Sequence, residues 1–409
     1  MHTPQKRLAL QHDLVRLRRD LHADPEVGLA LPRTRRRVLD ALAGLPLEIT
    51  LGRDIGSVTA VLRGGRPGPS VLLRGDMDAL PLAERTGLDY ASGNGAMHAC
   101  GHDLHTAMLV GAARLLCERR HLLAGDVVFM FQPGEEGEDG AAKMIAEGVL
   151  EAAGTLPVAA YATHVMSARF PHGIFTTRRG PLMAGADLLS LTVHGTGGHG
   201  SAPHLARDPI PAVAAVVGAL PGLLSRTVDP ADTAVLTIGA IHAGAAGNVI
   251  PDRAELLGTL RWHDARTRDA LREGFAEVCR SIARAHGVTA DPGVVEYLDV
   301  TANDPDEADF VAAVAAEVHG ARRYRDLPQP LCAGEDFCRI LERVPGAMIL
   351  LGACPPDLDP AQAFDNHSPY AIFDDAVLTD GALLHAEIAA RRLAAATIAD
   401  RPTADAHTG

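Results

Sequence analysis

The sequence contains no apolar stretch long enough to cross a membrane and no segment of secretory type. Its N-terminal residues, MHTPQKRLALQHDLVRLRRD, are charged and amphipathic instead of continuously apolar. The most apolar stretch, Pro209–Leu224, is shorter than the roughly 20 residues that a bilayer span requires, and it contains three prolines. We therefore expect a cytoplasmic protein without a membrane partner, in which Pro209–Leu224 folds as a buried helix.

Cysteine is scarce, and basic residues are too few and too scattered to form a patch. Six irregularly spaced cysteines in 409 residues do not make a disulfide framework, which favours reduced thiols. Only Lys6 and Lys143 are lysines, and 51 acidic residues outnumber 38 basic ones, for a net charge of −13. Such a balance argues against nucleic acid or an anionic membrane as a partner, and leaves a small molecule as the expected ligand.

Apolar runs that resemble buried strands alternate with helical patterns in the first part of the chain. These runs begin after Ser70, Asp126 and Pro157, and each is followed by a loop rich in glycine or charged residues. The segment Thr106–Arg120 has apolar residues at helical spacing. This alternation predicts an α/β sheet, in which ligands bind beyond the carboxyl ends of the strands.

The pattern changes at about Asp187, where the order of strands and helices becomes βαββαβ. This order is that of a ferredoxin-like module. We therefore predict a discontinuous α/β domain, residues 1–183 and 301–395, interrupted by an α+β module, residues 184–300, and followed by a flexible tail, residues 396–409.

The stretch MHACGHDLHTA concentrates metal-binding residue types near the start of a predicted helix. Gly101 allows a sharp turn that lets Cys100 and His102 point at one position, and thiolate and imidazole are strong ligands for zinc-like ions. A single Cys-x-His is nevertheless more often a buried free cysteine beside structural histidines. The motif therefore needs partners elsewhere in the chain.

The stretch PGEEGEDG places Glu135 and Glu136 directly after a predicted strand. Adjacent side chains diverge, so one carboxylate can bind a metal while its neighbour acts as a general base. The alternative is a solvated acidic turn, but the preceding strand directs the pair toward the ligand-binding edge of the sheet. His164 follows a strand in the same manner, and His367 lies in a loop; either histidine alone indicates little.

Four segments together resemble one family: MHACGHDLHTA, QPGEEGEDGAAKMIAEG, RRGPLMAGADLLSLTVHGTGGHGSAPH and GNVIPDRAELLGTLR. They are similar to the hippurate hydrolase and indole-acetyl-amino-acid amidohydrolase branch of the aminoacylase and glutamate-carboxypeptidase superfamily of di-metal hydrolases. The match extends in order from about Leu14 to Phe373. It implies a mixed-sheet, zinc-peptidase-like catalytic domain with an inserted lid and dimerisation domain.

The resemblance also implies a set of site residues and their roles. Two divalent ions, such as Zn, Mn, Ni or Co, would be held by Cys100, His102, Glu136, His164 and His367. Glu135 would be the general base, and Asp78 the acid just behind the ligands. Cys100 stands where the wider superfamily has a bridging aspartate. Asp76 stands where that superfamily has a metal-binding histidine, a donor role that His102 takes over here.

Four further residues belong to the expected substrate site. By the resemblance, His199 stabilises the tetrahedral intermediate, often from the partner subunit of a homodimer or homotetramer. Asn248 and Arg261 would grip the α-carboxylate of the substrate as a pair, and Gly334 lies in a family loop near the metals. Without the resemblance, Arg261 on a strand would be interpreted as a surface residue and His199 as a loop histidine.

The predicted reaction is hydrolysis of the amide bond of an N-acyl-L-amino acid to a carboxylate and a free amino acid. A carboxypeptidase or dipeptidase of the same superfamily is the alternative. Less favoured are a thiol hydrolase that uses Cys100 with His102 or His105 as its base, and a metal-dependent binding protein without turnover. The presence of Glu135 argues against the binding protein, which has no need of a general base.

Overall fold

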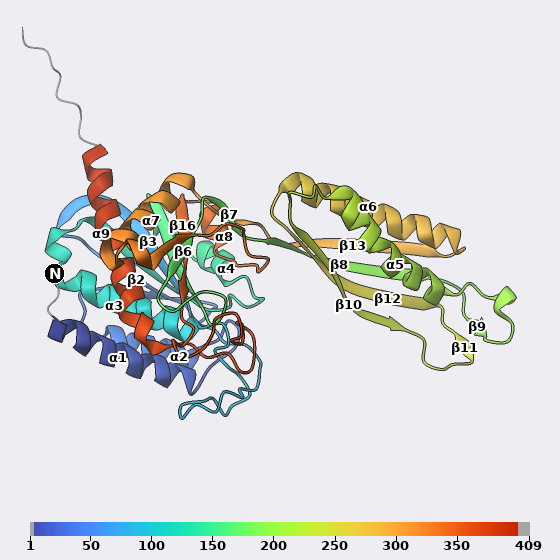
Figure 1. Cartoon of the computed structure of the whole chain (residues 1–409), viewed down its shortest axis with the longest axis horizontal. Coiled ribbons are helices and arrows are strands. Elements are labelled where there is room, and N and C mark those ends of the chain that lie inside the picture. The colour runs from blue at the N-terminus through green and yellow to red at the C-terminus, as the bar shows by residue number, and fades with distance from the viewer. Residues whose placement is uncertain (1–3, 400–409) are drawn as a thin grey trace, which may run out of the picture. The chain divides into compact units, whose positions relative to one another are not determined.

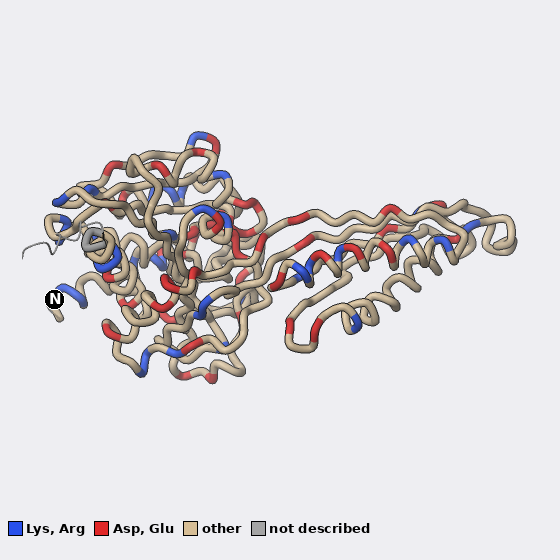
Figure 2. Tube along the Cα trace, turned by 90° about the horizontal axis from the view of Figure 1, so that it is seen from above, with Lys and Arg blue, Asp and Glu red and all other residues tan. Residues whose placement is uncertain are grey.

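The computed structural model describes residues 4–399, and its chain divides into two compact units (Figure 1). The first unit contains the described residues up to Gly180, together with Ala302–Pro328 and the chain from Arg339 onward. The second contains Pro181–Thr301 and Gln329–Cys338. Acidic and basic residues are interspersed along both units, without a long basic run among the described residues (Figure 2).

The first unit is built on a mixed sheet of eight described strands in the order β1-β2-β4-β3-β5-β16-β6-β15. These strands are β1 (Glu48–Leu51), β2 (Val58–Leu62), β3 (Arg66–Asp76), β4 (Ala124–Gln132), β5 (Ala159–Met166), β6 (Phe175–Thr177), β15 (Tyr324–Asp326) and β16 (Gly346–Gly352). Strand β3 is parallel to both β4 and β5, and β16 is parallel to β5. Strand β2 pairs antiparallel with β1 and with β4. The carboxyl ends of the central strands therefore meet at one edge, as expected for an α/β ligand site.

Helices cover this sheet and bury its apolar side chains. Those of the first unit are α1 (Pro4–His22), α2 (Pro32–Leu42), α3 (His102–Glu118), α4 (Gly140–Ala146), α7 (Pro305–His319), α8 (Cys338–Leu341) and α9 (Leu378–Ala399). Helix α3 packs against α9, and both contact β3 (Figure 1). Nearly all of α3 is buried, which agrees with its long run of Ala, Leu, Met and Val. Its first residue, His102, is thereby fixed at the carboxyl edge of the sheet.

The second unit has a four-stranded antiparallel sheet in the order β10-β12-β8-β13. Its elements in chain order are β8 (Gly185–His194), α5 (Pro209–Thr227), β10 (Ala234–Ala243), β12 (Arg253–Trp262), α6 (Ala265–Ala285) and β13 (Thr289–Leu298). Two short strands, β9 (Gly198–His199) and β11 (Val249–Ile250), pair with each other. The element order is the predicted βαββαβ. One face of the sheet forms a core with α5 and α6 around Trp262 and Phe275.

Helix α5 differs from the expected buried helix. It buries one face, which includes Ala212, Val213, Val216 and Leu220, and leaves the opposite face exposed. By length and composition alone, this described helix could cross a membrane. It packs instead against α6, β10 and β12. The uniform apolar composition of this segment concealed its amphipathic burial, because alanine and glycine are tolerated on an exposed face.

The segment Gln329–Cys338 was expected from the sequence to join the α/β domain, but it belongs to the second unit. Its main chain is hydrogen-bonded there, since the Ala184 N–H donates to the carbonyls of Leu331 and Ala333 at 3.0 and 2.8 Å. The predicted tail also begins later than expected, because α9 continues to Ala399. The rest of that tail, residues 400–409, lies outside the described residues.

Candidate metal centre

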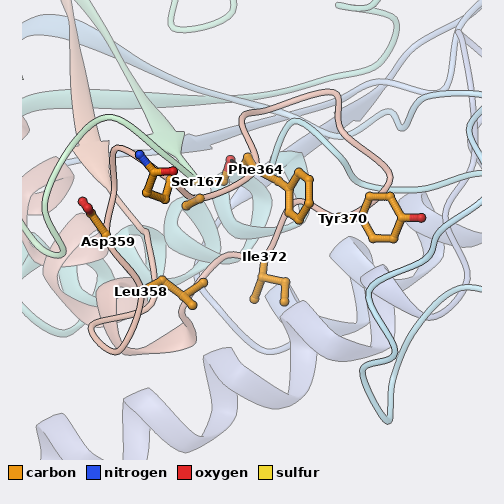
Figure 3. Close-up of a pocket in the computed structure, with 8 residues that line it drawn as sticks. Ser167, Leu358, Asp359, Phe364, Tyr370 and Ile372 are labelled. Carbon is orange, nitrogen blue, oxygen red and sulfur yellow. Dashed lines mark hydrogen bonds between the residues drawn. The ribbon is translucent and has the colours of Figure 1, made fainter.

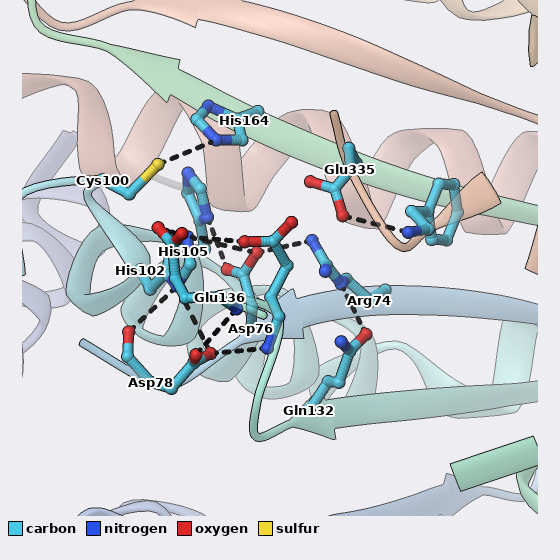
Figure 4. A network of polar contacts seen from close by, with 12 residues as sticks. Arg74, Asp76, Asp78, Cys100, His102, His105, Gln132, Glu136, His164 and Glu335 are labelled. Carbon is cyan, nitrogen blue, oxygen red and sulfur yellow. Dashed lines mark hydrogen bonds and ion pairs between the residues drawn. The ribbon is translucent and has the colours of Figure 1, made fainter. Parts of the chain in front are cut away.

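Two strand ends and the start of one helix in the first unit bring most of the predicted metal-binding residues together (Figure 4). Glu135 and Glu136 follow β4, and His164 lies near the end of β5. Cys100 and His102 flank the start of α3. The sequence therefore places these side chains at the carboxyl edge of the sheet, and the structure brings them within reach of one another.

The Cys100 thiol is the common point of the cluster. Its Sγ lies 3.4 Å from Nε2 of His164 and 3.3 Å from Nε2 of His367. It belongs to two groups of donors whose atoms all lie within 4.8 Å of one another, one with His102 and His164, the other with Glu136 and His367. Sulfur and imidazole nitrogen suit zinc-like ions, and the shared thiol gives the cluster two neighbouring cation positions.

The two buried histidines are oriented so that one nitrogen of each faces the cluster. Nδ1 of His102 lies 2.9 Å from the carbonyl oxygen of Asp78, and Nδ1 of His164 lies 2.9 Å from that of Val165. Each Nδ1–H can donate to its carbonyl, which leaves Nε2 with a free lone pair. Nε2 of His102 is buried without a hydrogen-bond partner among the described residues, and burial lowers the pKa of His164 well below its usual value. These donors fit a divalent cation.

The turn between Cys100 and His102 depends on glycine. Gly101 has φ +83°, and a Cβ atom on it would lie 2.3 Å from Cγ2 of Val165. Any larger residue would therefore be strained and would push against β5. His367 is held in a left-handed conformation too, with φ 69°, and its N–H donates to the Ala99 carbonyl at 2.9 Å. A non-glycine residue in that region is uncommon, and this hydrogen bond helps to hold the loop that carries His367.

Asp78 fixes the turn that carries the two glutamates. Its two carboxylate oxygens accept the main-chain N–H groups of Glu135 and Glu136, each at 3.0 Å. The side chains of both glutamates approach the cluster, since Oε2 of Glu135 lies 3.9 Å and Oε1 of Glu136 4.0 Å from Nε2 of His102. Asp78 thus contacts the main chain of the two glutamates through its carboxylate.

The neighbouring groups of the cluster raise the pKa values of two of its histidines. Hydrogen bonds to Cys100 and then to Glu136 raise the pKa of His367 to about 10. Burial is the largest single influence and would lower the pKa of His102, but Asp76, Asp78 and Cys100 together raise this pKa well above its usual value. A cation and a proton compete for the same imidazole lone pair, so cation binding at these rings would depend on pH.

The sequence did not anticipate how Asp76 and His105 are used. Asp76 ends β3, and its carboxylate contacts both the guanidinium of Arg74 and Nδ1 of His105. The sequence suggested His105 only as the base of a thiol hydrolase. The spacing of His105 three residues after His102 did signal that both rings lie on one face of α3.

The predicted substrate-binding residues lie in the second unit and form two separate groups. His199 on β9 and Asn248, the residue just before β11, are exposed neighbours, and Gly200 N–H donates to the Asn248 carbonyl at 2.8 Å. Arg261 lies near the other end of the sheet, opposite Ala186 at the start of β8.

Within one chain, Asn248 and Arg261 therefore lie apart along the sheet. Strand β12 begins at Arg253, and its eight residues from there to Arg261 extend about 26 Å at roughly 3.3 Å per residue. Gly334 instead accompanies Arg261, because a Cβ atom at Gly334 would lie 2.7 Å from Nη1 of Arg261.

A small apolar cavity of about 150 Å³ borders the loop that carries His367 (Figure 3). Its walls include Leu358, Phe364, Tyr370 and Ile372. The cavity contains none of the predicted site residues, and its lining has no group of metal donors. The chemistry indicated by the sequence is therefore located in the polar cluster of Figure 4 and not in this cavity.

Comparisons with known proteins agree with this geometry. The sequence profile of "Peptidase family M20/M25/M40" matches residues 72–391. The chain is 36% identical over 392 residues to a hippurate hydrolase of Campylobacter jejuni, covering 94% of this chain and 98% of that protein. It is also 36% identical over 385 residues to thermostable carboxypeptidase 1 of Saccharolobus solfataricus, covering 92% and 95%. A crystal structure of a dinuclear metal-binding peptidase of family M20 from Bacillus subtilis superimposes with a TM-score of 0.80 at 32% identity, covering 94% and 99%.

Proposed function

The chain belongs to peptidase family M20/M25/M40 and is a hydrolase of amide bonds, and we propose that it cleaves N-acyl-L-amino acids of the hippurate type. The observation that carries the proposal is the convergence of two donor groups on Cys100, with Glu135 beside them. A hydrolase of amides needs a polarised carbonyl and an activated water, and this cluster offers the groups for both.

Two divalent ions fit the cluster. One would be held by Cys100, His102 and His164, and the other by Cys100, Glu136 and His367. Bound there, the ions would polarise the scissile carbonyl and make water easier to deprotonate. Zn, Mn, Ni and Co all suit thiolate, imidazole and carboxylate ligands, so the donors select a class of metal and not one element.

Glu135 is the proposed general base. Its carboxylate would take a proton from the attacking water and deliver it to the leaving amine, which couples bond formation to departure of the amino acid. The turn that carries Glu135 is held by Asp78, so the base is positioned by main-chain hydrogen bonds. Glu136, which lies 3.1 Å from Nε2 of His367, takes the ligand role.

The second unit would supply recognition of the substrate as the lid and dimerisation domain. Arg261 is the proposed partner of the α-carboxylate, since a guanidinium can hold a carboxylate through two parallel hydrogen bonds. Gly334 would leave room for this guanidinium. In a homodimer or homotetramer, His199 and Asn248 would reach the site of a neighbouring chain together, because they lie side by side and far along the sheet from Arg261.

A carboxypeptidase or dipeptidase is the second candidate. The similarity to a protein named thermostable carboxypeptidase is as high as that to hippurate hydrolase. All three activities cleave an amide bond next to a free carboxylate, so the same clamp and the same base serve each of them. They differ in what precedes the scissile bond: a simple acyl group, a blocked peptide or a free amino acid.

A substrate panel tests the proposal. Benzoylglycine, acetyl amino acids and indole-acetyl amino acids are compared with benzyloxycarbonyl dipeptides and with free dipeptides, and kcat/KM is measured for each. We expect the simple N-acyl amino acids to be cleaved fastest. Faster cleavage of blocked or free dipeptides would move the assignment to carboxypeptidase or dipeptidase. Chelation distinguishes a thiol hydrolase based on Cys100, which would keep its activity without metal.

A further inference from the structure

Both ring nitrogens of His105 are engaged within the chain. This histidine lies in α3, three residues after His102, and its side chain is 1% exposed. Its Nδ1 lies 2.6 Å from Oδ1 of Asp76, and its Nε2 accepts the main-chain N–H of Val165 at 2.8 Å. The ring thus joins the end of β3 to the residue that follows His164 on β5.

These two contacts fix the position of the proton on the ring. A main-chain N–H can only donate, so Nε2 must present its lone pair to Val165. The proton of the neutral ring is therefore on Nδ1, where it is donated to Asp76. Asp76, His102 and His105 form a group whose donor atoms lie within 4.8 Å of one another. A cation could nevertheless bind His105 only by breaking one of its two hydrogen bonds.

The Asp76 carboxylate is held from its other side too. Oδ2 of Asp76 accepts a hydrogen bond from Nη1 of Arg74 at 2.5 Å, and Nε of Arg74 donates to the Gln132 side chain at 2.9 Å. The same Oδ2 lies 3.6 Å from Nε2 of His102. Both carboxylate oxygens are thus occupied by donors of the chain, next to a predicted ligand (Figure 4).

The main chain is built to allow this arrangement. A Cβ atom at Gly75 would lie 3.0 Å from the carbonyl oxygen of His105, so α3 approaches β3 closely where a side chain would crowd it. The Thr106 hydroxyl donates to the Asp76 carbonyl at 2.8 Å. Helix and strand are therefore joined on both sides of the His105–Asp76 contact.

We propose that His105 is a positioning residue of the metal centre, neither a ligand nor the base. Through Val165 it holds the end of β5, and with it His164, at the distance from Cys100 that a shared ion requires. Through its Nδ1–H it keeps Asp76 as an uncoordinated anion beside His102. The inference rests on the proposed function, because it takes His102 and His164 to hold an ion.

The test compares His105→Asn and His105→Ala with His319→Asn as the matched control. His319 is another buried histidine of the first unit, with a side chain 3% exposed. Each metal-free protein is titrated with Zn²⁺ against a chromophoric chelator, and its thermal unfolding is recorded. Asparagine retains an N–H donor near the position of Nδ1 but offers no acceptor to Val165, so it preserves half of the arrangement.

We expect His105→Asn still to bind two ions per chain, but with the affinity for one of them lowered by about 10- to 100-fold. This is the usual effect of removing a residue that orients a ligand. His105→Ala should weaken it further. His319→Asn should bind both ions as the unmodified protein does, even if it unfolds at a similarly lowered temperature. The pH dependence of kcat should keep its shape in His105→Asn, because the base is unchanged.

Four results would overturn the inference. Unchanged affinities in His105→Asn would remove the positioning role. A stoichiometry of one ion, with the other unaffected, would make His105 a ligand, and a lost limb in the pH profile would make it a base. A ¹⁵N NMR spectrum of the unmodified protein with the His105 proton on Nε2 would contradict the tautomer without any variant. If the unmodified protein binds no ion at all, the proposed function itself fails, which the titration of that protein alone reveals.

Discussion

The two units of the molecule present their predicted functional residues in opposite ways. In the first unit, the candidate metal-binding side chains are mostly buried, and hydrogen bonds to carbonyls and carboxylates aim them at one another. In the second, His199 and Asn248 are exposed, and Arg261 lies about 26 Å along β12 from Arg253, the residue at which that strand begins. The residues of the candidate metal centre thus come together within one chain, whereas the proposed substrate-binding residues do not.

This contrast separates chemistry from recognition. Residues that activate water must be held to within a fraction of an ångström, which a buried edge of a sheet achieves. Residues that grip a substrate can be brought to it by a second surface. Substitutions in the first unit should therefore abolish turnover or metal binding, and substitutions in the second should change selectivity and depend on assembly.

The largest expected effect is that of Glu135→Gln. Loss of a general base lowers kcat by about 10²- to 10⁴-fold, while metal content should remain that of the unmodified protein. Glu136→Gln is the matched variant one residue away, and it should instead lose metal because Glu136 faces Cys100 and His367. Metal analysis beside steady-state kinetics checks both. If Glu135→Gln lost metal and Glu136→Gln kept it, the two roles would have to be exchanged.

Arg261→Ala should change selectivity more than catalysis. An N-acyl amino acid should be cleaved faster than its own C-terminal amide, because the amide leaves the guanidinium without a charged partner. Such a loss costs about 2 to 5 kcal/mol in a closed site, or about 30- to 4,000-fold in kcat/KM. The variant should lose most of this preference by slowing cleavage of the acid alone. Equal rates on acid and amide in the unmodified enzyme would instead indicate a general amidase.

Complementation tests whether the second unit acts across chains. His199→Ala and Glu135→Gln should each be inactive, but mixed dimers contain one site with both residues intact. An equal mixture should therefore recover about one quarter of the activity of the unmodified protein after chain exchange. Mass spectrometry of the mixture verifies that mixed dimers form. If they form without activity, His199 serves its own chain or no site at all.

Gly334→Ala should have the smallest effect. The added Cβ would approach Nη1 of Arg261 to 2.7 Å, and the flexible guanidinium can shift away at little cost. We expect KM for the acid substrate to rise a few-fold with kcat and KM for the amide unchanged. Gly239→Ala is the control, since a Cβ there meets nothing within 4 Å in the same unit. An equal change in both variants would reflect the fold and not the clamp.

Part of the candidate metal centre could be predicted because two of its residues come shortly after a strand. Glu135 and Glu136 come after an apolar run, so the sheet edge and the donor chemistry are both readable along the chain. His164 and His367 were identifiable only through the family resemblance, since a lone histidine after a strand or in a loop has no distinctive pattern. The contacts of His105 were not predictable, because they depend on how closely α3 approaches β3 and β5.

The separation of Asn248 from Arg261 within one chain has a cause that the sequence does contain. Thirteen residues separate them, and most of those residues form the extended strand β12, which carries Arg261 away from the turn. The burial of only one face of α5, by contrast, leaves no sign in the sequence. Its alanines, glycines and prolines give no contrast between the covered and the exposed side.

The central claim is that one chain of this family member builds a di-metal centre around Cys100. Its most direct test is a titration of chelated, metal-free protein with Zn²⁺ or Mn²⁺, in which hydrolysis of benzoylglycine and bound metal are followed together. We predict that activity is absent without metal and rises until two ions are bound per chain. Cys100→Ala should bind fewer than two ions per chain. Full activity in protein shown to be free of metal would contradict the account.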